Sequence, residues 1–480
     1  MAITIFKQPQ LLTPTYNPMI ISVNSNLQTQ ESFQFVADIT VRGNLVTTMK
    51  VPVNPQGYGV FDIQRHVENE ISFDFNPTVT GFQRAQLSGA TYSVGFKEEY
   101  RYFFNFVDNV FVTGGFVGFY GPSGGSQPVF VIGDQIVVEQ TSPTPTNPQY
   151  NGLATVTNIS QITISGTLRW MITTNKPFGA SSPTQGGKIS LSNFRLTQFP
   201  VAATVTKRDA FNGVLDFYDE LSWDNLVYMM SPNGNKKFLT DIFSGYKMFS
   251  GDKMWLNFYQ RDFSVVRLAV RNDAGVVTYI NNTFTTVTND LNRLLRIAVG
   301  PAQILPVIGS TAFYDIWLED VSGDRMSEEL RFIVKDKCSR YEKIQLVFMD
   351  KLGSFIPYTF NMVNKHNVNI TKSNYQQIYG RYAPASQNWV YNSWDRGKKS
   401  LDTVVVERFT INSDWMDQKT SDLMIILAES PEVYWIKEDG LTVAINLTVS
   451  DVERKQTIND QIVNYTMTFE LSNKNNKQRG

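Results

Sequence analysis

Apolar and polar residues alternate most regularly in the stretch 342–360, EKIQLVFMDKLGSFIPYTF. Every second residue from Ile344 to Phe348 is apolar, which is the period of a β-strand with one apolar and one more polar face. Gly353 suits a turn because glycine adopts positive φ without steric cost. The pattern predicts a β-hairpin whose second strand covers residues 355–360.

The same period of two recurs nearer the N-terminus. Residues 31–53 alternate around Gly43-Asn44, which predicts a second hairpin with its turn at that dipeptide. Over residues 58–71 the apolar spacing changes to four, which is the spacing of a short helix. Alternation then returns at 92–106, so this region is predicted to be a β-sandwich that carries a helical crossover.

Residues 128–178 contain five short strand-like runs separated by turn residues. Short strands at this spacing are typical of a small SH3-like or OB-like barrel. Barrels that bind nucleic acid present aromatic and basic residues together, and this segment offers Arg169, Trp170 and Lys176 for that role. We expect a packing module inserted into the first domain rather than a binding barrel.

Two further hairpins are predicted between residues 206 and 336, with turns at 272–275 and 322–324. Apolar residues on the two strands of the second hairpin are expected to pair across it: Tyr314, Ile316 and Leu318 with Leu330, Phe332 and Val334. Strands without a long helical pattern predict an immunoglobulin-like or fibronectin-like sandwich, a fold that by itself fixes no function.

From residue 337 onward, strand patterns combine with one short helix. Leu423, Ile426 and Leu427 form an apolar stripe on that helix. The helix is expected to stop before Pro431, because the residue before a proline is disfavoured in the helical conformation. Two alternating strand runs follow before a polar C-terminal tail.

Together these patterns predict a mainly β, multi-domain chain. It combines immunoglobulin-like or fibronectin-like sandwiches with a small inserted β-barrel and a few short helices. The predicted domains are an N-terminal sandwich, the inserted barrel, a middle sandwich and a C-terminal α+β domain with hairpins: 1–127 plus 179–205, 128–178, 206–336 and 337–480.

Composition narrows the class of partners. The chain has 480 residues, and its formal net charge of -1 gives no bulk field toward nucleic acid or an anionic membrane. We therefore expect neither dedicated nucleic-acid binding nor membrane association. Cys338 is the sole cysteine, so no intrachain disulfide can form, which favours assembly in a reducing compartment. The N-terminus shows no secretory pattern, and no run reaches the about 18 apolar residues of a membrane helix.

Catalytic and metal-binding patterns are weak. His66 falls in the predicted short helix and His366 in a polar loop, and neither has a neighbour at metal-ligand spacing, so both are expected to be solvated. The glycine-rich run 114–125 is expected to be a loop, and it lacks the Lys-Ser or Lys-Thr of a phosphate-binding loop. The acidic run that begins at Asp320 resembles a calcium loop but has Arg325 where glycine is required.

Carboxylates cluster at 216–220 and at 319–320, and a glycosidase needs two of them across a sugar groove. Sequence spacing alone does not establish such a pair, and carboxylates in turns are the commoner explanation. Cys338 has no histidine near it in sequence to activate a thiolate. The sequence therefore predicts no catalytic residues, no metal site and no cofactor, and we expect the protein not to be an enzyme.

Exposed aromatic residues are the stronger candidate site. Trp389, Tyr391 and Trp394 lie in a predicted polar loop beside Arg396. Trp, Tyr and Arg supply most of the binding energy at protein interfaces, so these residues predict an interface. Two alternatives stay open: stacking on a sugar ring, and ordinary core packing.

Two stretches resemble a known group of proteins. The hairpin YEKIQLVFMDKLGSFIPYTF, with the following helix and the SPEVYWI block, resembles C-terminal regions of virion proteins from tailed phages of Bacteroidetes-type hosts, including crAss-like phages. The run FQFVADITVRGNLVTTMKVPVNPQGYGVFDI resembles the N-terminal sandwich of the same kind of protein. The resembling motifs are structural and imply no functional residues.

The resemblance implies a non-enzymatic virion structural protein of the tail, neck ring or baseplate. Its expected partners are copies of itself in a ring and adjacent tail, portal or baseplate proteins. The expected location is the virion, after assembly in the bacterial cytoplasm. The alternative is a carbohydrate-binding or carbohydrate-degrading adsorption protein, such as a tail fibre or spike, built from the same sandwiches.

Overall fold

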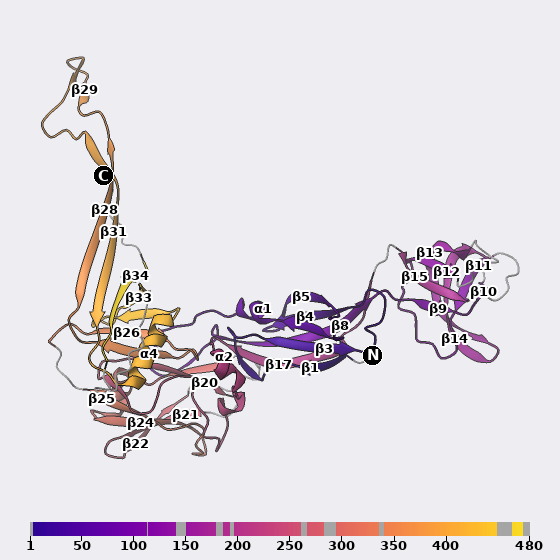
Figure 1. Cartoon of the computed structure of the whole chain (residues 1–480), viewed down its shortest axis with the longest axis horizontal. Helices are drawn as coiled ribbons and strands as arrows, with labels where there is room; N and C mark the ends of the chain where they lie inside the picture. The colour runs from indigo at the N-terminus through magenta and orange to yellow at the C-terminus, as the bar shows by residue number, and fades with distance from the viewer. Residues whose placement is uncertain are drawn as a thin grey trace. The chain divides into compact units, whose positions relative to one another are not determined.

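The computed structural model describes nine stretches of the chain: residues 3–112, 114–140, 150–178, 186–192, 196–260, 266–282, 294–335, 340–448 and 463–473. The fold is mainly β with a few short helices, as predicted (Figure 1). The chain divides into two compact units. Unit 1 contains Met1–Pro9, Pro18–His66 and Tyr92–Arg208, and unit 2 contains Gln10–Asn17, Val67–Thr91 and Asp209–Gly480.

Unit 1 contains a β-sandwich. One sheet is formed by three strands: β1(Ile3–Lys7), β3(Ile20–Ser25) and β6(Gly59–Asp62). The facing sheet includes these strands: β4(Gln34–Val41), β5(Asn44–Pro52), β8(Gly89–Tyr100), β16(Thr197–Gln198) and β17(Ala203–Phe211). Phe61 and Phe96, from opposite sheets, are fully buried with ring centroids 5.4 Å apart. The predicted short helix is α1(Gln64–Glu68).

The predicted N-terminal hairpin is confirmed as β4 and β5. Val41 pairs with Asn44, so the turn consists of Arg42 and Gly43, one residue earlier than predicted. Both turn residues have positive φ, 50° and 83°. This is the conformation of the tight turns whose twist matches that of a β-hairpin.

Unit 1 also contains a seven-stranded sheet with the order β10-β11-β14-β13-β12-β15-β9. Its strands are β9(Phe104–Phe106), β10(Asp108–Val112), β11(Phe116–Tyr120), β12(Gln135–Gln140), β13(Gly152–Ile164), β14(Thr167–Pro177) and β15(Gly187–Leu191). Within the described residues no pairing joins β10 to β9, so the sheet is open and the predicted closed barrel is not formed. Four of the strands lie outside the predicted range 128–178.

The predicted glycine-rich loop at 114–125 is wrong in its centre, which is strand β11. A Cβ at Gly118 would lie 2.6 Å from Sδ of Met171 on the neighbouring strand β14. The glycine therefore allows close packing between adjacent strands. Phe119 and Ile172, also on these strands, are fully buried in the core of this sheet.

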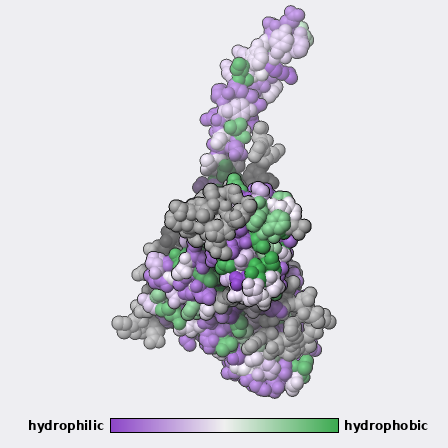
Figure 2. Space-filling model, turned by 90° about the vertical axis from the view of Figure 1, so that its right-hand side faces the viewer, coloured by the Kyte–Doolittle hydropathy of each residue, from purple (hydrophilic) through white to green (hydrophobic). Residues whose placement is uncertain are grey.

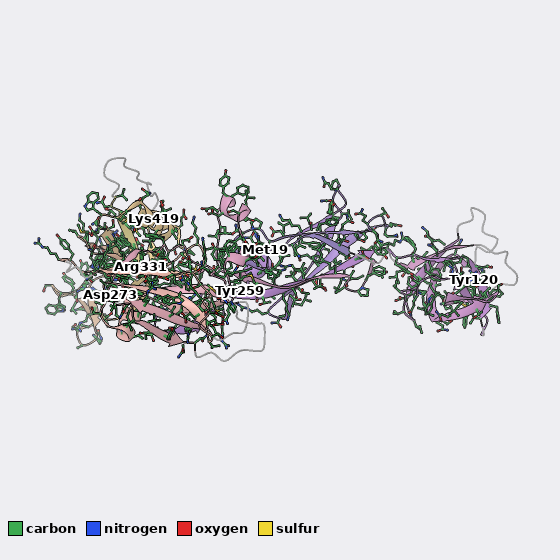
Figure 3. All side chains as sticks on the ribbon, turned by 90° about the horizontal axis from the view of Figure 1, so that it is seen from below. Met19, Tyr120, Tyr259, Asp273, Arg331 and Lys419 are labelled. Carbon is green, nitrogen blue, oxygen red and sulfur yellow. The ribbon has the colours of Figure 1, made fainter. Side chains whose placement is uncertain are left out.

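Unit 2 is built on two sheets. The smaller has the order β19-β25-β24-β21-β22. Its strands are β19(Tyr246–Phe249), β21(Val266–Asn272), β22(Val277–Asn281), β24(Phe313–Asp320) and β25(Leu330–Lys335). Tyr314 pairs with Phe332 and Ile316 with Leu330, so the predicted hairpin is formed, but its ladder ends at Ile316↔Leu330 and does not include Leu318. Arg331 and Asp273 belong to this part of unit 2 (Figure 3).

The larger sheet has the order β28-β31-β34-β33-β32-β26-β27-β20-β23-β7. Its strands are β7(Phe82–Arg84), β20(Trp255–Gln260), β23(Leu294–Ala298), β26(Ile344–Met349), β27(Phe355–Phe360), β28(Lys365–Gln376), β31(Lys398–Asn412), β32(Val433–Ile436), β33(Thr442–Leu447) and β34(Thr466–Leu471), with β18(Met229–Met230) paired beside β20. Strands from both sides of residue 336, the predicted domain boundary, thus share one sheet.

A common core joins these two sheets. It contains Leu268 and Ile316 from the smaller sheet and Leu256, Leu346 and Phe348 from the larger one. Both sheets contribute their apolar faces to this core, which is the construction of a β-sandwich. Residues 206–336 and 337–480, predicted as separate domains, therefore contribute to the same core.

One helix, α4(Gln418–Glu429), covers part of this core. Asp417 caps its N-terminus by accepting a 2.9 Å hydrogen bond from the Thr420 amide. Leu423 and Leu427 are buried while Ile426 is partly buried, and the helix ends before Pro431, as predicted.

The predicted hairpin at 342–360 is confirmed as β26 and β27, with Gly353 in the turn at a φ of 89°. The expected contrast between its two faces is not present. All six residues of β26, including Gln345, are buried, because β26 is a central strand between β27 and β32. A strand buried on both faces does not require strict alternation.

Candidate interaction site on an exposed β-arm

A long β-arm projects from unit 2 where the sequence predicted a polar loop. The arm comprises residues 368–407 and continues the ladder in which β28 pairs with β31 from Lys365↔Thr410 to Gln376↔Lys398. Strand β34 joins β31 only from Arg408 onward among the described residues. Over residues 368–376 of β28 the ribbon therefore has two strands and no third one beside it in the part of the chain that the structure describes. This stretch spans roughly 30 Å at about 3.3 Å per residue. The arm and its labels β28, β31 and β29 are visible in Figure 1.

The arm is exposed along its length. All twelve residues of β28 are exposed. They include apolar side chains that a folded core would bury, such as Val368 at 49% and Ile370 at 55% exposure. Figure 2 shows the arm as the narrow projection at the top of the view, where hydrophobic residues (green) lie between hydrophilic ones (purple). An isolated two-stranded ribbon is only marginally stable in water.

Aromatic stacking supports the base of the arm. The rings of His366 and Phe409 stack at 4.2 Å between centroids, and Phe409 stacks on Phe469 of β34 at 5.0 Å. His366 Nε2 also lies 3.3 Å from a carboxylate oxygen of Glu407. The prediction that His366 lies in a polar loop is therefore wrong, because this residue is part of strand β28.

The tip of the arm, residues 377–399, contains all four predicted interface residues. Its short hairpin consists of β29(Arg381–Ala383) and β30(Asn388–Val390). Trp389 Nε1 donates a 3.0 Å hydrogen bond to the carbonyl of Tyr379. Tyr391 packs edge-to-face against Tyr379, with ring centroids 5.7 Å apart. Trp389 and Tyr391 thus help to hold the tip together.

The side chains of Trp394 and Arg396 are exposed to solvent, and Trp394 is more exposed than Trp389, which is hydrogen-bonded within the tip. Trp394 is 77% exposed, compared with 50% for Trp389. Arg396 is exposed, and its carbonyl accepts a 3.1 Å hydrogen bond from the Gln377 side chain. The Asp395 amide donates a 3.0 Å hydrogen bond to the Asn392 carbonyl, which closes a turn that contains Trp394. Backbone hydrogen bonds thus hold this segment while the side chains of Trp394 and Arg396 stay exposed. Core packing, one of the alternatives for these aromatic residues, does not occur in this chain.

Within the turn of the β26–β27 hairpin, a buried carboxyl group holds the backbone. Asp350, only 2% exposed, accepts hydrogen bonds from the amides of Asp241 at 3.0 Å, Leu352 at 3.1 Å and Ser354 at 2.7 Å. It also accepts a 2.6 Å bond from the Thr240 hydroxyl. Burial, and then the charge of Asp241, raise the pKa of Asp350 well above its ordinary value. Because its oxygens are engaged by the protein itself, Asp350 has a structural role.

A buried arginine, Arg296, also helps to hold the turn of the β26–β27 hairpin through Asn257. Arg296 Nε donates to Asn257 Oδ1 at 2.8 Å, and Asn257 Nδ2 donates to the Gly353 carbonyl at 2.6 Å. Arg296 also donates to the Asp74 carbonyl. Burial lowers the pKa of Arg296 to about 10. Local sequence patterns gave no sign of this network, since its members are up to 222 residues apart.

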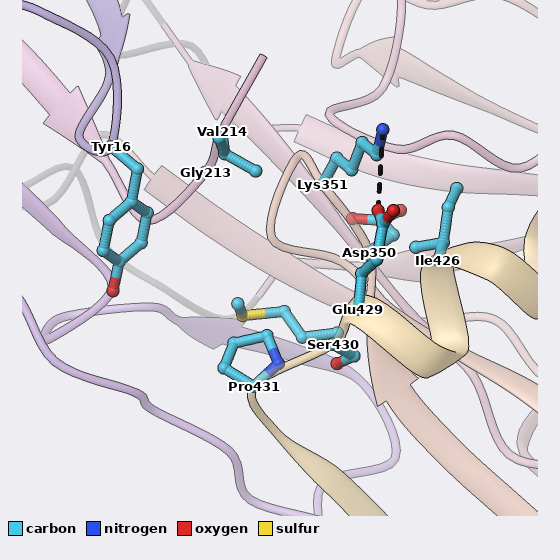
Figure 4. A pocket seen from close by; sticks show the side chains of 10 residues that line it. Tyr16, Gly213, Val214, Asp350, Lys351, Ile426, Glu429, Ser430 and Pro431 are labelled. Atoms are coloured by element: carbon cyan, nitrogen blue, oxygen red, sulfur yellow. Dashed lines mark ion pairs between the residues drawn. The ribbon is translucent and has the colours of Figure 1, made fainter. Parts of the chain in front are cut away.

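A pocket opens beside the same turn, with a volume of about 390 Å³ (Figure 4). We call it the Lys351 pocket. It is lined by Tyr16, Gly213, Val214, Met349, Asp350, Lys351, Ile426, Glu429, Ser430 and Pro431. Lys351 Nζ lies 2.9 Å from Asp216 and 3.8 Å from Glu429. Although burial lowers it, the pKa of Lys351 is raised overall by the hydrogen bond to Asp216 and by neighbouring carboxylates.

The other candidate groups have structural partners. Glu319 pairs with Arg267 at 2.9 Å and also accepts a 2.6 Å bond from the Trp317 indole. Asp320 accepts the amide hydrogens of Ser322 and Asp324, so it stabilises the turn that resembled a calcium loop. Neither carboxylate is left for a bound sugar.

For metal binding and membrane spanning, the structure gives observations on the described residues alone. Among these, no group of three or more His, Cys, Asp or Glu residues is arranged to hold a metal ion. In the same part of the chain no helix has the length and apolar character needed to cross a membrane. Cys338 lies outside the described residues.

Comparison with known proteins gives no functional assignment. No family model and no curated protein matches this chain. The crystal structure of the four N-terminal Ig domains of Dscam1 isoform 8.4 is 11% identical with a TM-score of 0.12, covering 86% of this chain and 96% of that one. Native E. coli alpha-2-macroglobulin is 9% identical with a TM-score of 0.14, covering 97% of this chain and 30% of that one. Similarities this remote carry no information on function.

Proposed function

We propose that this chain is a non-enzymatic structural protein of a phage virion, in the tail, neck ring or baseplate. In that role it assembles into a ring with copies of itself and binds adjacent virion proteins through the β-arm. The observation that carries the proposal is the arm, whose tip presents Trp394 at 77% exposure in a turn closed by the Asp395 amide and the Asn392 carbonyl.

The physical reason is that the arm exposes large apolar side chains although, among the described residues, only two paired strands stabilise it. Val368, Ile370 and Leu401 expose about half or more of their surface along a ribbon that two strands alone support. Val368 and Ile370 are two residues apart and therefore lie on the same face of the ribbon. Adjoining exposed apolar side chains mark interaction sites in folded proteins. A partner that covers the ribbon would bury these side chains and stabilise the two strands together. The resemblance to virion proteins supplies the class of partner.

The direct test is the assembly state of the purified full-length chain, alone and with the adjacent virion proteins. Mass photometry should show a discrete oligomer, and electron microscopy should show it as a closed ring. Adjacent proteins are included because a ring can require a template on which to close. A chain that stays monomeric under all these conditions overturns the proposal.

Carbohydrate binding is the second candidate function, because exposed Trp394 and Tyr391 offer faces that a sugar ring can stack on. Two outcomes separate the candidates. Retention of the chain on host capsular polysaccharide, lost in Trp394→Ala, supports an adsorption protein. Steady release of reducing ends from that polysaccharide would show hydrolysis and overturn the non-enzymatic proposal.

A further inference from the structure

We infer that the arm tip of one copy of this chain binds the Lys351 pocket of a second copy. The inference rests on the proposed assembly function and adds which two surfaces meet. A closed ring requires contacts in which one face of each copy meets a different face of the next. The arm tip and the Lys351 pocket are two such faces, and their shape and charge are complementary.

The walls of the pocket are suited to an apolar side chain. Val214, Met349 and Ile426 supply aliphatic surface, and Tyr16 and Pro431 extend it (Figure 4). The volume of about 390 Å³ lies near the lower end of the range of about 300–1,000 Å³ for ligand pockets. This size suits one large side chain, such as an indole, rather than a folded segment.

The rim of the pocket is acidic. The side chains of Glu429 and Asp216 are 59% and 66% exposed, and both lie near Lys351. Partial burial raises the pKa of Asp241, and the nearby charges of Asp219 and Asp216 raise it further. The positive charge of Lys351 thus neutralises only one of several carboxylates, so the net negative charge of the rim favours a cationic partner.

An apolar surface continues from this rim. Val214 and Asp216 lead directly into α2(Phe217–Leu221). On this short helix Phe217, Tyr218 and Leu221 are 68%, 80% and 72% exposed. Large side chains exposed side by side on a single turn mark a surface that another molecule covers.

The arm tip has the complementary properties. Four cations lie within residues 377–399 against the single carboxylate of Asp395, a net charge of 4 − 1 = +3: Arg381, Arg396, Lys398 and Lys399. Trp394 stands among them with 77% of its surface exposed. Trp394 fills the pocket in this arrangement, while Arg396, two residues on, pairs with Glu429 or Asp216 at the rim. Aromatic anchors in pockets and charge-assisted Arg–carboxylate pairs are the contacts that dominate interface affinity.

The pocket that a given tip fills belongs to another copy. The two paired strands of the arm run away from α4, whose C-terminal residues line the pocket (Figure 1). The β28–β31 ladder from Val368 to Gln376 holds the tip at the far end of the arm from the pocket. A tip folded back onto the pocket of its own chain would have to break this ladder.

The test places a photo-crosslinking amino acid, p-benzoylphenylalanine, at position 394 of the full-length chain. Equal amounts of ¹⁵N-labelled and unlabelled protein are mixed before assembly, so that mixed-isotope peptides identify links between copies. Crosslinks from position 394 to peptides containing residues 214, 349, 426 or 431 of the other copy are expected. Links to a different surface, or to an adjacent virion protein, overturn this inference but leave the proposed assembly function standing. Absence of any oligomer overturns both.

A charge exchange gives an independent measurement. Arg396→Glu is expected to weaken self-association by roughly tenfold or more, as loss of an interface hot spot does. Glu429→Lys in the same chain should restore it at least partly, because the pair is then reversed. Glu438→Lys, at an exposed carboxylate in the turn after β32, is the control that should not restore it. Equal recovery with both second changes would contradict the pairing.

Discussion

Two hairpins that follow one another in the chain differ in nearly every physical respect. β26–β27 is buried on both faces, and its turn is held by hydrogen bonds to the Asp350 carboxylate within the turn. β28–β31 begins five residues after β27 ends, yet every residue of β28 is exposed. The first hairpin belongs to the core that folds unit 2. The second contributes little to that core and is, in our proposal, the part that binds other molecules.

The glycines in the two hairpins should separate these roles most strongly. At Gly353 a Cβ would lie 2.5 Å from the Asn212 carbonyl oxygen, and φ is 89°. Gly353→Ala should therefore lower the free energy of unfolding of unit 2 by about 3 kcal/mol. Chemical denaturation measures this difference.

Gly380 in the arm tip is the matched control. Its φ is 98°, and a Cβ there would lie 2.5 Å from Trp389 Nε1. Gly380→Ala should distort the tip and weaken assembly without changing the unfolding free energy of the monomer. Equal destabilisation by the two alanines would remove the distinction between a folding hairpin and a binding hairpin.

A pH effect is expected in the buried hairpin. Asp252 accepts hydrogen bonds from the Thr359 hydroxyl at 2.5 Å on β27 and from the Phe249 amide at 2.8 Å. Burial raises its pKa from the ordinary 3.8 to about 6. The folded state therefore binds more protons than the unfolded state between these values, so stability is lost as pH rises from about 4 through 6.

The loss amounts to roughly 2–3 kcal/mol at about 1.4 kcal/mol per pKa unit. Asp252→Asn should remove it, because the amide can still accept from Phe249 and donate to Thr359. Urea denaturation of both proteins at pH 4.5 and pH 7.5 checks the prediction. An equally steep pH dependence in the variant would show that other groups are responsible.

Trp394→Ala should weaken assembly by about 2 kcal/mol per contact, or roughly 30-fold, as truncation of an interface anchor does. Its monomer should unfold like the wild type, since Trp394 is 77% exposed. Trp415→Ala is the matched control, because Trp415 is also exposed, at 59%, but lies outside the arm. Sedimentation velocity compares the three proteins, and identical association constants would exclude Trp394 from the interface.

Sequence patterns predicted the local hairpins well because each depends on neighbouring residues. The turn at Gly353 was predicted from the conformational freedom of glycine, and the hairpin that contains Tyr314 and Phe332 was predicted from alternation. The arm was missed because β28 is exposed on both faces, and polar residues on both faces look like a loop. The aromatic residues at its tip were nevertheless visible in the sequence as unusual for a polar segment.

Long-range pairing explains what local patterns could not predict. β7 pairs with β23 across about 200 residues, and this pairing places residues 82–84 in unit 2. The Arg296–Asn257–Gly353 network likewise joins three distant segments. The Lys351 pocket, lined from four separate parts of the chain, was also beyond prediction from spacing.

Removing the arm is the most direct test that it serves assembly and not folding. In this variant Asn-Gly replaces residues 368–407, so that a tight turn joins Asn367 to Arg408, a pair in the native ladder. Calorimetry should give a melting temperature within about 2 °C of the wild type. Mass photometry with the adjacent virion proteins should show monomers where the wild type assembles. Assembly at wild-type strength, or a large fall in melting temperature, would contradict the account.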